Sequence, residues 1–375
     1  MRDSIPGNGV FTESCMTEDY SAEFDFLSNK KVLVTGGTGF AGRHLLPILV
    51  KSGAVVTCAV RASSDTRGLP EGVTAITVDF ATGQGLQEAM SGQDIVIHMA
   101  SLLFGITGQD YLRTNALMAR QLAFAVKRLQ EEGKINSGFR FVLVSSQAAT
   151  GPCAAAPGTP DNAVPFPVSF YGWSKLFAEE ILGRELGEAM VTLRPPIIYG
   201  SGDRGLLPMF RGVKNGLAFC PGFLRKFSVS AVHADDMVRG VLHLCHPRAH
   251  GVYHISDGNV YRMDEFYRVM GEAFNDVLGR QRRTLIFHLP NVVLAASAAI
   301  SSFYGFAADS VLRLGGGRGL SRPPQWNLDK CREACQDGWV CDGSRLSGEL
   351  GFVPRITLKE GMTEAVRGYL RDGWL

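Results

Sequence analysis

Short apolar runs alternate with helical segments through the first half of this 375-residue chain. The runs of strand length, rich in β-branched residues, are 31–36, 55–60, 73–79, 94–100 and 139–146. Segments with helical spacing lie between them and end at glycines. Because strands that are apolar on both faces must be covered on both sides, this alternation predicts a doubly wound α/β domain with a parallel sheet.

A glycine-rich loop joins the first predicted strand to the first predicted helix. In VLVTGGTGFAGRHL, Gly36, Gly39 and Gly42 follow the strand directly and lead into helical sequence. Glycines let the backbone turn tightly and approach a pyrophosphate, whose charge then lies against amide groups at a helix N-terminus. The loop therefore predicts a dinucleotide-binding site.

The end of the second predicted strand bears on which dinucleotide is bound. An NAD site usually has an acidic residue there, whereas an arginine can receive the 2′-phosphate of NADP. This chain has Arg61, followed by Ser63 and Ser64. We therefore favour NADP, with NAD as the alternative if Asp65 reaches the ribose and Arg61 is only a solvated loop residue.

The alternation loosens after about residue 200, where glycine, proline and aromatic residues become frequent. The predicted organisation is a flexible extension over 1–29, a dinucleotide-binding domain over 30–200 and a smaller carboxy-terminal substrate lobe over 201–375. Two short strand candidates, within about 228–256, either rejoin the first sheet or form a small sheet beside it.

Charge and cysteine content argue against a nucleic-acid-binding site and against a zinc site. Lysine and arginine total 38 against 36 aspartates and glutamates, so nothing favours a nucleic-acid partner. Among the eight cysteines no CxxC pair occurs, and Cys331 and Cys335 have no further ligands nearby to complete a zinc site. We predict no metal, and reduced thiols in a cytoplasmic protein.

Residues 289–309 form the longest weakly polar stretch, without a charge between Pro290 and Asp309. Its alanines and serines make it only mildly hydrophobic, whereas a membrane-spanning helix needs about 20 strongly apolar residues. The stretch therefore predicts a buried helix, or one that covers an apolar substrate pocket. Peripheral contact with a membrane is a less favoured alternative.

A series of motifs in the same order resembles the extended short-chain dehydrogenase/reductase family, also called the NAD-dependent epimerase/dehydratase family. The motifs are TGGTGFAG, VDF at 78–80, HMAS at 98–101, VLVSSQAATG at 142–151, YGWSK at 171–175, RPPIIYGSGD at 194–203 and VHADDM at 232–237. The resemblance covers nearly all of residues 30–375. It implies a Rossmann fold and an NAD(P)-dependent enzyme.

Tyr171 and Lys175 are four residues apart, on one face of a predicted helix. A tyrosine with the usual pKa of about 10 is a poor base at neutral pH, and a nearby ammonium group favours its phenolate. The resemblance implies that Tyr171 is the general acid/base and Lys175 its electrostatic partner. It also implies that Ser146 polarises the substrate oxygen, with Ser145 as its neighbour at the strand end.

The resemblance implies further contacts with the cofactor at the adenine ring, the pyrophosphate and the nicotinamide. The predicted cofactor-binding residues are Gly36, Gly39, Phe40, Gly42, Arg61, Asp79, Phe80, Ala100, Tyr171, Lys175, Pro195 and Ile198. Asn115 matches a recurrent asparagine of the family, or bonds only neighbouring backbone. His98 is predicted to pack at a strand end rather than to act as a base or a metal ligand.

Departures from the family pattern narrow the predicted reaction. Gln147 and Ala148 replace the Asp-Glu pair of dehydratases, and RPPIIYG lacks the asparagine with which sugar-nucleotide enzymes hold phosphate. The VR ending of the second strand and the RPPIIYGSGDR segment instead resemble the branch of dihydroflavonol-reductase-like and 3β-hydroxysteroid-dehydrogenase-like enzymes. That branch acts on bulky, often apolar alcohols and ketones.

We therefore predict an NAD(P)-dependent oxidoreductase that interconverts a secondary alcohol and a ketone on a bulky, apolar small molecule through Ser146, Tyr171 and Lys175. One alternative is a nucleotide-sugar epimerase, which would use the same residues and tightly bound NAD without net cofactor turnover. Another is a non-catalytic NAD(P)-binding subunit. Because family members often dimerise through a four-helix contact that includes the helix bearing Tyr171, a homodimer is expected.

Overall fold

The computed structural model describes residues 21–222, 226–315, 320 and 323–375. At its centre is a parallel sheet of seven strands in the order β11-β6-β5-β4-β1-β2-β3. The strands are β1 (Lys31–Thr35), β2 (Val55–Val60), β3 (Val73–Thr77), β4 (Ile95–His98), β5 (Arg140–Val144), β6 (Met190–Arg194) and β11 (Gly251–His254). The predicted doubly wound parallel sheet is confirmed.

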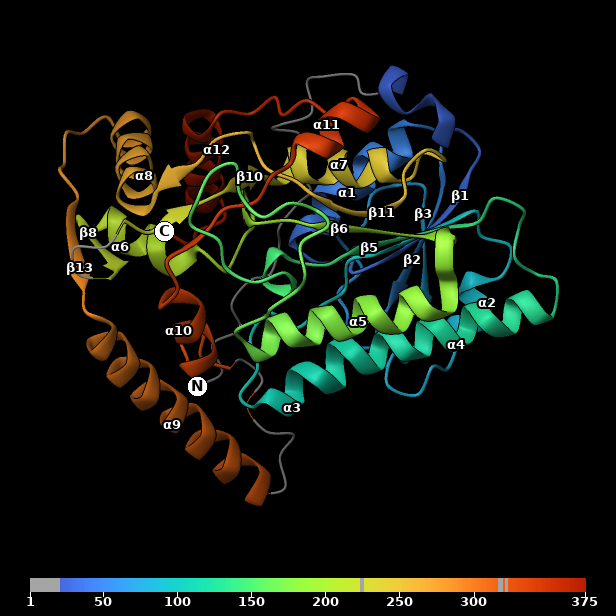
Figure 1. The fold of residues 1–375 in the computed structure, drawn as a ribbon, viewed down its shortest axis with the longest axis horizontal. Coiled ribbons are helices and arrows are strands. Elements are labelled where there is room, and N and C mark those ends of the chain that lie inside the picture. Colours follow the sequence, from blue (N-terminus) through green and yellow to red (C-terminus); the bar gives the residue numbers. More distant parts are fainter. Residues whose placement is uncertain (1–20, 223–225, 316–319, 321–322) are drawn as a thin grey trace.

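Helices cover both faces of the sheet (Figure 1). One face packs against α1 (Phe40–Lys51), α7 (Ala234–Leu244) and α11 (Ser344–Leu350), and the other against α2 (Leu86–Met90), α4 (Leu117–Glu131) and α5 (Phe170–Leu186). Successive residues of β1 show the alternation, because Val32 packs with α1 while Leu33 packs with α4. Burial on both faces explains why the inner strands β1, β4 and β5 are almost continuously apolar.

The strand order reverses at β1, since β2 and β3 extend the sheet on one side while β4, β5 and β6 extend it on the other. Ligands of such sheets bind at this switch point, outside the carboxyl ends of the strands. The predicted runs at 94–100 and 139–146 are longer than β4 and β5. Their last residues leave the strand ladder and turn toward the switch point, where the predicted site lies.

The carboxy-terminal lobe lies to the left of the sheet in Figure 1 and has its own apolar core. Its helices are α6 (Leu207–Lys214), α8 (Met263–Leu278), α9 (Asn291–Leu314), α10 (Leu328–Ala334) and α12 (Leu358–Arg371). Its short strands pair as β7 (Ile197–Tyr199) with β10 (Ala231–His233), as β8 (Leu217–Pro221) with β13 (Leu285–Leu289), and as β9 (Ser228–Val229) with β12 (Tyr261–Arg262) and β14 (Gly338–Trp339). Short helical segments elsewhere are α3 (Gly108–Tyr111), η2 (Leu112–Ala116), η3 (Gln147–Ala149) and η4 (Gly187–Ala189).

The helix α9 differs from the prediction for residues 289–309. The helix forms, but only Leu294, Ala298 and Gly305 are buried, so the expectation of a buried helix is wrong. Within the described parts of the chain, α9 is the one helix whose length and apolar composition would suffice to cross a membrane.

The fold begins earlier than the predicted boundary near Lys30. Residues 1–20 lie outside the described part of the chain, but η1 (Ser21–Leu27) buries Phe24 and Leu27 in the core of the sheet. Glu23 of η1 accepts hydrogen bonds from Arg239 at 2.7 Å and Arg355 at 2.8 Å, and its carboxylate lies 3.0 Å from the His243 imidazole. The predicted flexible extension over 1–29 is therefore wrong for residues 21–29, because apolar burial and this ion cluster fix η1 to the domain.

Glu23 should stabilise the fold in a pH-dependent way. Burial alone would raise its pKa, but hydrogen bonds from His243 and Arg239 and the nearby arginine charges lower the pKa to about 2. Since this pKa lies below that of the unfolded state, the stabilisation is present above about pH 4.5 and is lost as the pH falls toward 2. Thermal unfolding of Glu23→Gln should therefore show a lowered Tm at pH 7 and little difference from the parent near pH 2. Exposed Asp25→Asn is the matched control, and an equal effect of both changes would refute the role of the cluster.

Candidate active site

The glycine loop after β1 passes close to the end of β4. Gly36 has a φ of +79°, and a Cβ there would lie 2.7 Å from the backbone nitrogen of Ala100. A Cβ on Gly42 would collide with the carbonyl oxygen of Gly36. The loop leads into α1, whose N-cap Gly39 offers no side-chain acceptor, so the first amide groups of the helix remain for another acceptor. This cradle fits the pyrophosphate of a dinucleotide.

A cavity of about 2100 Å³ extends from this loop into the carboxy-terminal lobe. Pockets for a single small molecule usually measure about 300–1,000 Å³, so this one has room for a cofactor and a second bulky molecule. All the predicted cofactor residues except Gly42 line it, while Gly42 is buried where the loop packs on itself. The geometry brings these residues together, and their individual roles stay predictions.

The segments that follow β2 and β3 form the end of the cavity that is predicted to hold the adenosine. Arg61, Ser63 and Ser64 line this end, and the Arg61 side chain is exposed. Asp65 does not line the cavity, because its carboxylate accepts hydrogen bonds from Arg67 at 2.9 and 2.7 Å, which lower its pKa to about 2. The carboxylate that could have reached a ribose is thus engaged elsewhere.

The first turn of α5 carries Tyr171, and its second carries Lys175. Ser169 begins the helix by accepting a hydrogen bond from the Gly172 amide at 2.9 Å. Both Tyr171 and Lys175 are buried and line the cavity, on the helix face that meets the sheet. Lys175 Nζ donates to the Val144 carbonyl at 2.8 Å, at the end of β5, and burial lowers its pKa to about 8.

The Tyr171 phenol retains its proton at neutral pH. Burial raises its pKa to about 12, while hydrogen bonding with Ser146 and Ser101 has a smaller lowering effect. Ser146 follows β5 and lines the cavity beside Tyr171. The neighbouring Ser145 hydroxyl instead donates to Glu179, away from the phenol. The arrangement suits Tyr171 as a proton donor, with Ser146 as the hydroxyl beside it.

A buried ion pair holds α5 against the sheet. Arg194, the last residue of β6, donates to Glu179 of α5 at 3.1 Å from Nε and 2.5 Å from its terminal nitrogen. Ser145 adds a hydrogen bond to the same carboxylate. Glu179 lies one turn beyond Lys175. The Glu179–Arg194 pair therefore fixes the rotation of α5 about its axis and its position along that axis at the cavity.

The same arginine connects to a second buried chain of polar groups. Its other terminal nitrogen donates to Thr150 Oγ1 at 2.9 Å, and that hydroxyl lies 3.0 Å from His254 Nε2 of β11. His254 Nδ1 lies 2.8 Å from the carboxylate of Asp161. Thr150 is therefore part of the support under the site rather than of its wall.

The structure also places two residues whose role the sequence left open. Asn115 donates to the Leu102 carbonyl at 3.2 Å and to the Ser174 hydroxyl at 2.9 Å, and accepts from the Leu102 amide, so it ties the segment after β4 to α5. His98 is buried with Nδ1 2.6 Å from the Thr35 hydroxyl, and burial lowers its pKa to about 3. His98 is therefore neutral and packed at a strand end, as predicted.

The helix α10 covers the site from the carboxy-terminal lobe and was not part of the predicted site. Asp329 accepts hydrogen bonds from the backbone amides of Phe170 at 2.6 Å and Tyr171 at 3.1 Å. Lys330 Nζ lies 4.3 Å from the centre of the Tyr171 ring, and donates to Glu333 at 3.0 Å. No sequence signal connects these residues to Tyr171, since about 160 residues separate them and only the tertiary fold brings α10 onto α5.

The far end of the cavity is apolar. Residues of α6 and β8 and of the predicted stretch 289–309 all contribute, together with residues of α8 and of the segment before α10. The apolar lining residues include Leu206, Pro208, Met209, Phe219, Pro221, Met263, Tyr267, Leu289, Leu294, Trp326 and Trp339. Residues of α9 therefore help to cover the cavity, which is the second alternative predicted for that stretch.

Cys331 of α10 and Cys335, which directly follows this helix, lie close together, with their sulfur atoms 3.7 Å apart. Across the described ranges no group of three or more His, Cys, Asp or Glu side chains is placed to hold a metal ion.

A wound parallel sheet with a dinucleotide cradle at its switch point, and a Tyr-Lys helix beside it, defines a Rossmann-fold nucleotide-dependent enzyme. The chain belongs to the NAD-dependent epimerase/dehydratase family, whose model matches residues 32–256. The resemblance stated from the motifs is thus confirmed, as is the prediction of an NAD-dependent enzyme of the dehydrogenase, reductase or epimerase kind.

The individual relatives and the solved structure described next each share less than 30% sequence identity with this chain. A ceramide reductase of Caulobacter vibrioides is 27% identical over 349 residues, which are 92% of this chain and 96% of that protein. A 3-beta-hydroxysteroid dehydrogenase of Mycolicibacterium neoaurum is 28% identical over 260 residues, or 64% of this chain and 68% of the relative. The crystal structure of the Bordetella bronchiseptica enzyme WbmG in complex with NAD and UDP superposes with a TM-score of 0.68 at 18% identity, over 92% of this chain and 97% of that one.

Breaking the Glu179–Arg194 pair should destabilise the protein strongly. Glu179→Ala leaves a buried guanidinium without its partner, so we expect the free energy of unfolding to fall by about 3–5 kcal/mol in a denaturant titration. Glu180→Ala, on the exposed side of the same helix, is the control and should change it by less than about 0.5 kcal/mol. Glu179→Leu combined with Arg194→Met should recover part of the loss. If Glu179→Ala behaves like Glu180→Ala, the pair does not hold α5.

Proposed function

We propose that this enzyme interconverts a secondary alcohol and a ketone on a bulky apolar molecule, using NADP(H). The observation that carries the proposal is the meeting of Ser146, Tyr171 and Lys175 in one cavity that continues into an apolar lobe. A cofactor in the glycine cradle would occupy only part of that cavity. The remaining space borders the Tyr171 phenol and the apolar walls, where a ketone on a large hydrocarbon skeleton fits.

In the reducing direction the carbonyl carbon gains a hydride and the carbonyl oxygen gains a proton. The nicotinamide cofactor, when bound, supplies the hydride. Tyr171 donates the proton, which its raised pKa keeps on the phenol at neutral pH, and Ser146 holds the substrate oxygen in place. The charge of Lys175 lowers the free energy of the phenolate that remains. The Lys330 cation above the Tyr171 ring also lowers the free energy of the phenolate.

Two further observations favour an apolar substrate over a nucleotide sugar. The substrate end of the cavity is built mainly from aliphatic and aromatic side chains. Two relatives are named for a ceramide and for a 3-beta-hydroxysteroid, both of which are largely hydrocarbon. The epimerase alternative is tested by turnover, since an epimerase would show no net consumption of cofactor with its substrate.

Tyr171→Phe should abolish proton transfer and leave most of the cofactor affinity intact, because the other predicted cofactor-binding residues remain. Removing a general acid typically lowers the rate by about 10²–10⁴-fold, so we expect kcat to fall in that range with a 3-ketosteroid or a 3-keto sphingolipid as probe. NADPH oxidation reports the rate, and a thermal shift with NADP⁺ reports binding. Tyr111→Phe is the matched control, because Tyr111 is a buried tyrosine whose ring centre lies 6.2 Å from that of Tyr171. Unchanged activity of Tyr171→Phe would instead favour a non-catalytic role for the site.

Arg61 should set the preference for NADP over NAD. Its exposed guanidinium lies at the adenosine end of the cavity with two serine hydroxyls, while Asp65 is paired with Arg67. A hydrogen bond to a charged group contributes about 1.5–3 kcal/mol, so Arg61→Ala should raise KM for NADPH by about 10–100-fold and leave KM for NADH nearly unchanged. Lys51→Ala, an exposed cation at the end of α1, is the control. A purified protein that retains NAD and does not use NADPH would contradict the proposed preference for NADP.

A further inference from the structure

The helix α9 has the reverse polarity of a surface helix in a soluble protein, because its serines face the protein body and its apolar side chains face outward. Its serines bond to the protein body: Ser301 donates to the Trp326 carbonyl at 2.7 Å, and Ser302 accepts from the Leu328 amide at 2.9 Å. Ser297 accepts from the Trp326 indole at 3.0 Å. A helix that packs on a water-soluble body normally buries its apolar residues and exposes its polar ones.

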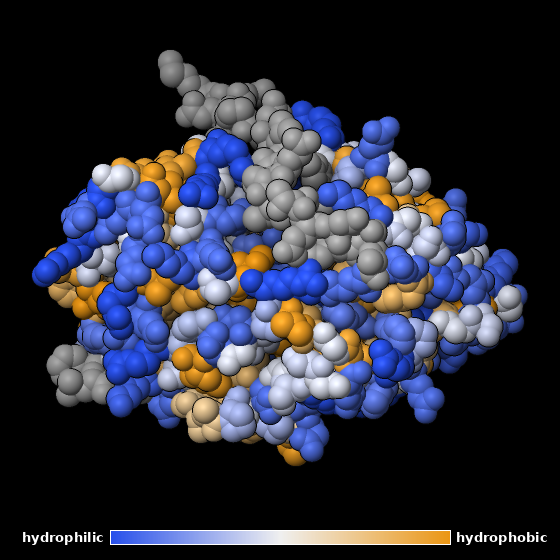
Figure 2. Space-filling model, turned by 90° about the horizontal axis from the view of Figure 1, so that it is seen from above, coloured by the Kyte–Doolittle hydropathy of each residue, from blue (hydrophilic) through white to orange (hydrophobic). Residues whose placement is uncertain are grey.

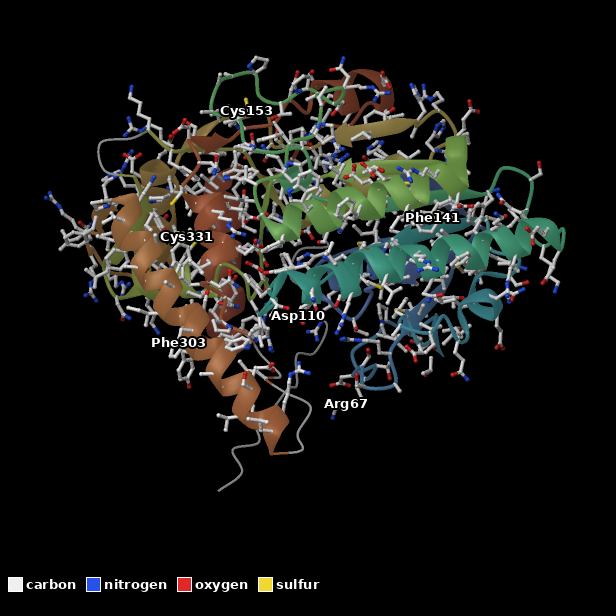
Figure 3. The ribbon with its side chains drawn as sticks, turned by 60° about the horizontal axis from the view of Figure 1, so that its bottom comes forward. Arg67, Asp110, Phe141, Cys153, Phe303 and Cys331 are labelled. Atoms are coloured by element: carbon white, nitrogen blue, oxygen red, sulfur yellow. The ribbon has the colours of Figure 1, made fainter. Side chains whose placement is uncertain are left out.

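The outward side of α9 is apolar. Its exposed large side chains are Val292, Val293, Ile300, Phe303, Tyr304, Phe306, Val311, Leu312 and Leu314. Phe303 is 74% exposed and points away from the body in Figure 3. No charged residue occurs from Asn291 to Ala308. Contiguous apolar surface of this kind marks an interaction site.

The exposed apolar surface continues from α9 onto the strands β8 and β13. Phe219 pairs with Phe287 across these strands, with ring centres 6.0 Å apart, and Leu217 pairs with Leu285. All four side chains are exposed. Pro290 joins β13 directly to α9. We call α9 together with these four residues the apolar face. By contrast, the view from above in Figure 2 shows mainly hydrophilic residues and only scattered apolar patches.

The apolar face is continuous with the substrate end of the cavity. Phe219 is 53% exposed and also lines the cavity. Leu289 and Leu294, at the junction of β13 with α9, line it as well. An apolar molecule held against the apolar face would therefore reach the cavity along hydrocarbon side chains.

We propose that the apolar face docks on an anionic lipid membrane, from which the apolar substrate enters the cavity. The charges that flank the face favour this partner, because the segment from Arg280 to Leu314 carries four arginines and the single acid Asp309. Arg282 and Arg283 are exposed just before β13, and Arg313 lies in the last turn of α9. Aromatic and aliphatic side chains with flanking arginines are the composition that binds anionic lipid interfaces.

The geometry points to a helix that lies on the membrane rather than one that crosses it. One side of α9 is held to the body from Leu294 near its start through Ser301 to Gly305. A Cβ on Gly305 would lie 2.7 Å from Pro324, which shows how closely the helix and the segment before α10 approach. Over these turns lipid can reach only the outward side, which favours α9 in the plane of the interface.

Vesicle flotation tests the docking surface without any substrate. The full chain should float with vesicles of phosphatidylcholine containing about 30% phosphatidylglycerol, and much less with phosphatidylcholine alone. The double variant Ile300→Glu and Phe303→Glu should reduce the bound fraction by about tenfold or more, because two apolar anchors become charged. Both side chains are exposed, so its Tm and its thermal shift with NADP⁺ should match those of the parent.

Phe124→Glu, which changes an exposed phenylalanine on α4, is the matched control and should float like the parent. The proposal is overturned if the parent does not float, or if the control loses binding equally. It is also overturned if the α9 double variant changes only the oligomeric state in sedimentation, which would make a second copy the partner. The route from membrane to cavity rests on the proposed function, but flotation does not, and Tyr171→Phe should float normally even if no ketone is reduced.

Discussion

The ion pair between Glu179 and Arg194 is the interaction on which the geometry of the site depends. It joins α5, which carries Tyr171 and Lys175, to the carboxyl end of β6, and Ser145 connects it to β5. A charged pair in this position is satisfied only when every partner is in place, since an unpaired buried charge is strongly unfavourable. The pair therefore selects one rotation and one height of α5, and with them the position of the phenol.

The second constraint comes from the other side of the cavity. The N-terminus of α5 is held by Asp329 and, through Ser169, by Glu333, so both ends of the reacting region are fixed, one by the sheet and one by α10. Because α10 follows α9 in the chain, the helix with the apolar outer side is tied directly to the helix that covers Tyr171. The proposed membrane-binding surface and the proposed active site thus share one small part of the carboxy-terminal lobe.

Local sequence patterns were sufficient for the first five strands and the helices between them. The β-branched runs predicted β1 to β5, and the glycine triplet predicted the cradle, because both depend on neighbouring residues. β6 was not among the predicted strands, although MVTLR is buried throughout. The boundary near Lys30 was wrong because Phe24 and Glu23 are stabilised by residues more than 200 positions away, which local patterns do not reveal.

The sequence by itself determined the sheet, the dinucleotide cradle and the spacing of Tyr171 and Lys175, because strand periodicity, glycine conformations and helical pitch are local properties of the chain. Only the tertiary structure decided which residues surround the phenol and which side of α9 faces water. Those outcomes depend on contacts between segments far apart in sequence, where packing and hydrogen bonding override composition. The serines of α9 show this most directly: the composition of the stretch predicted a buried helix, but the bonds of its serines to the body turn the apolar side outward.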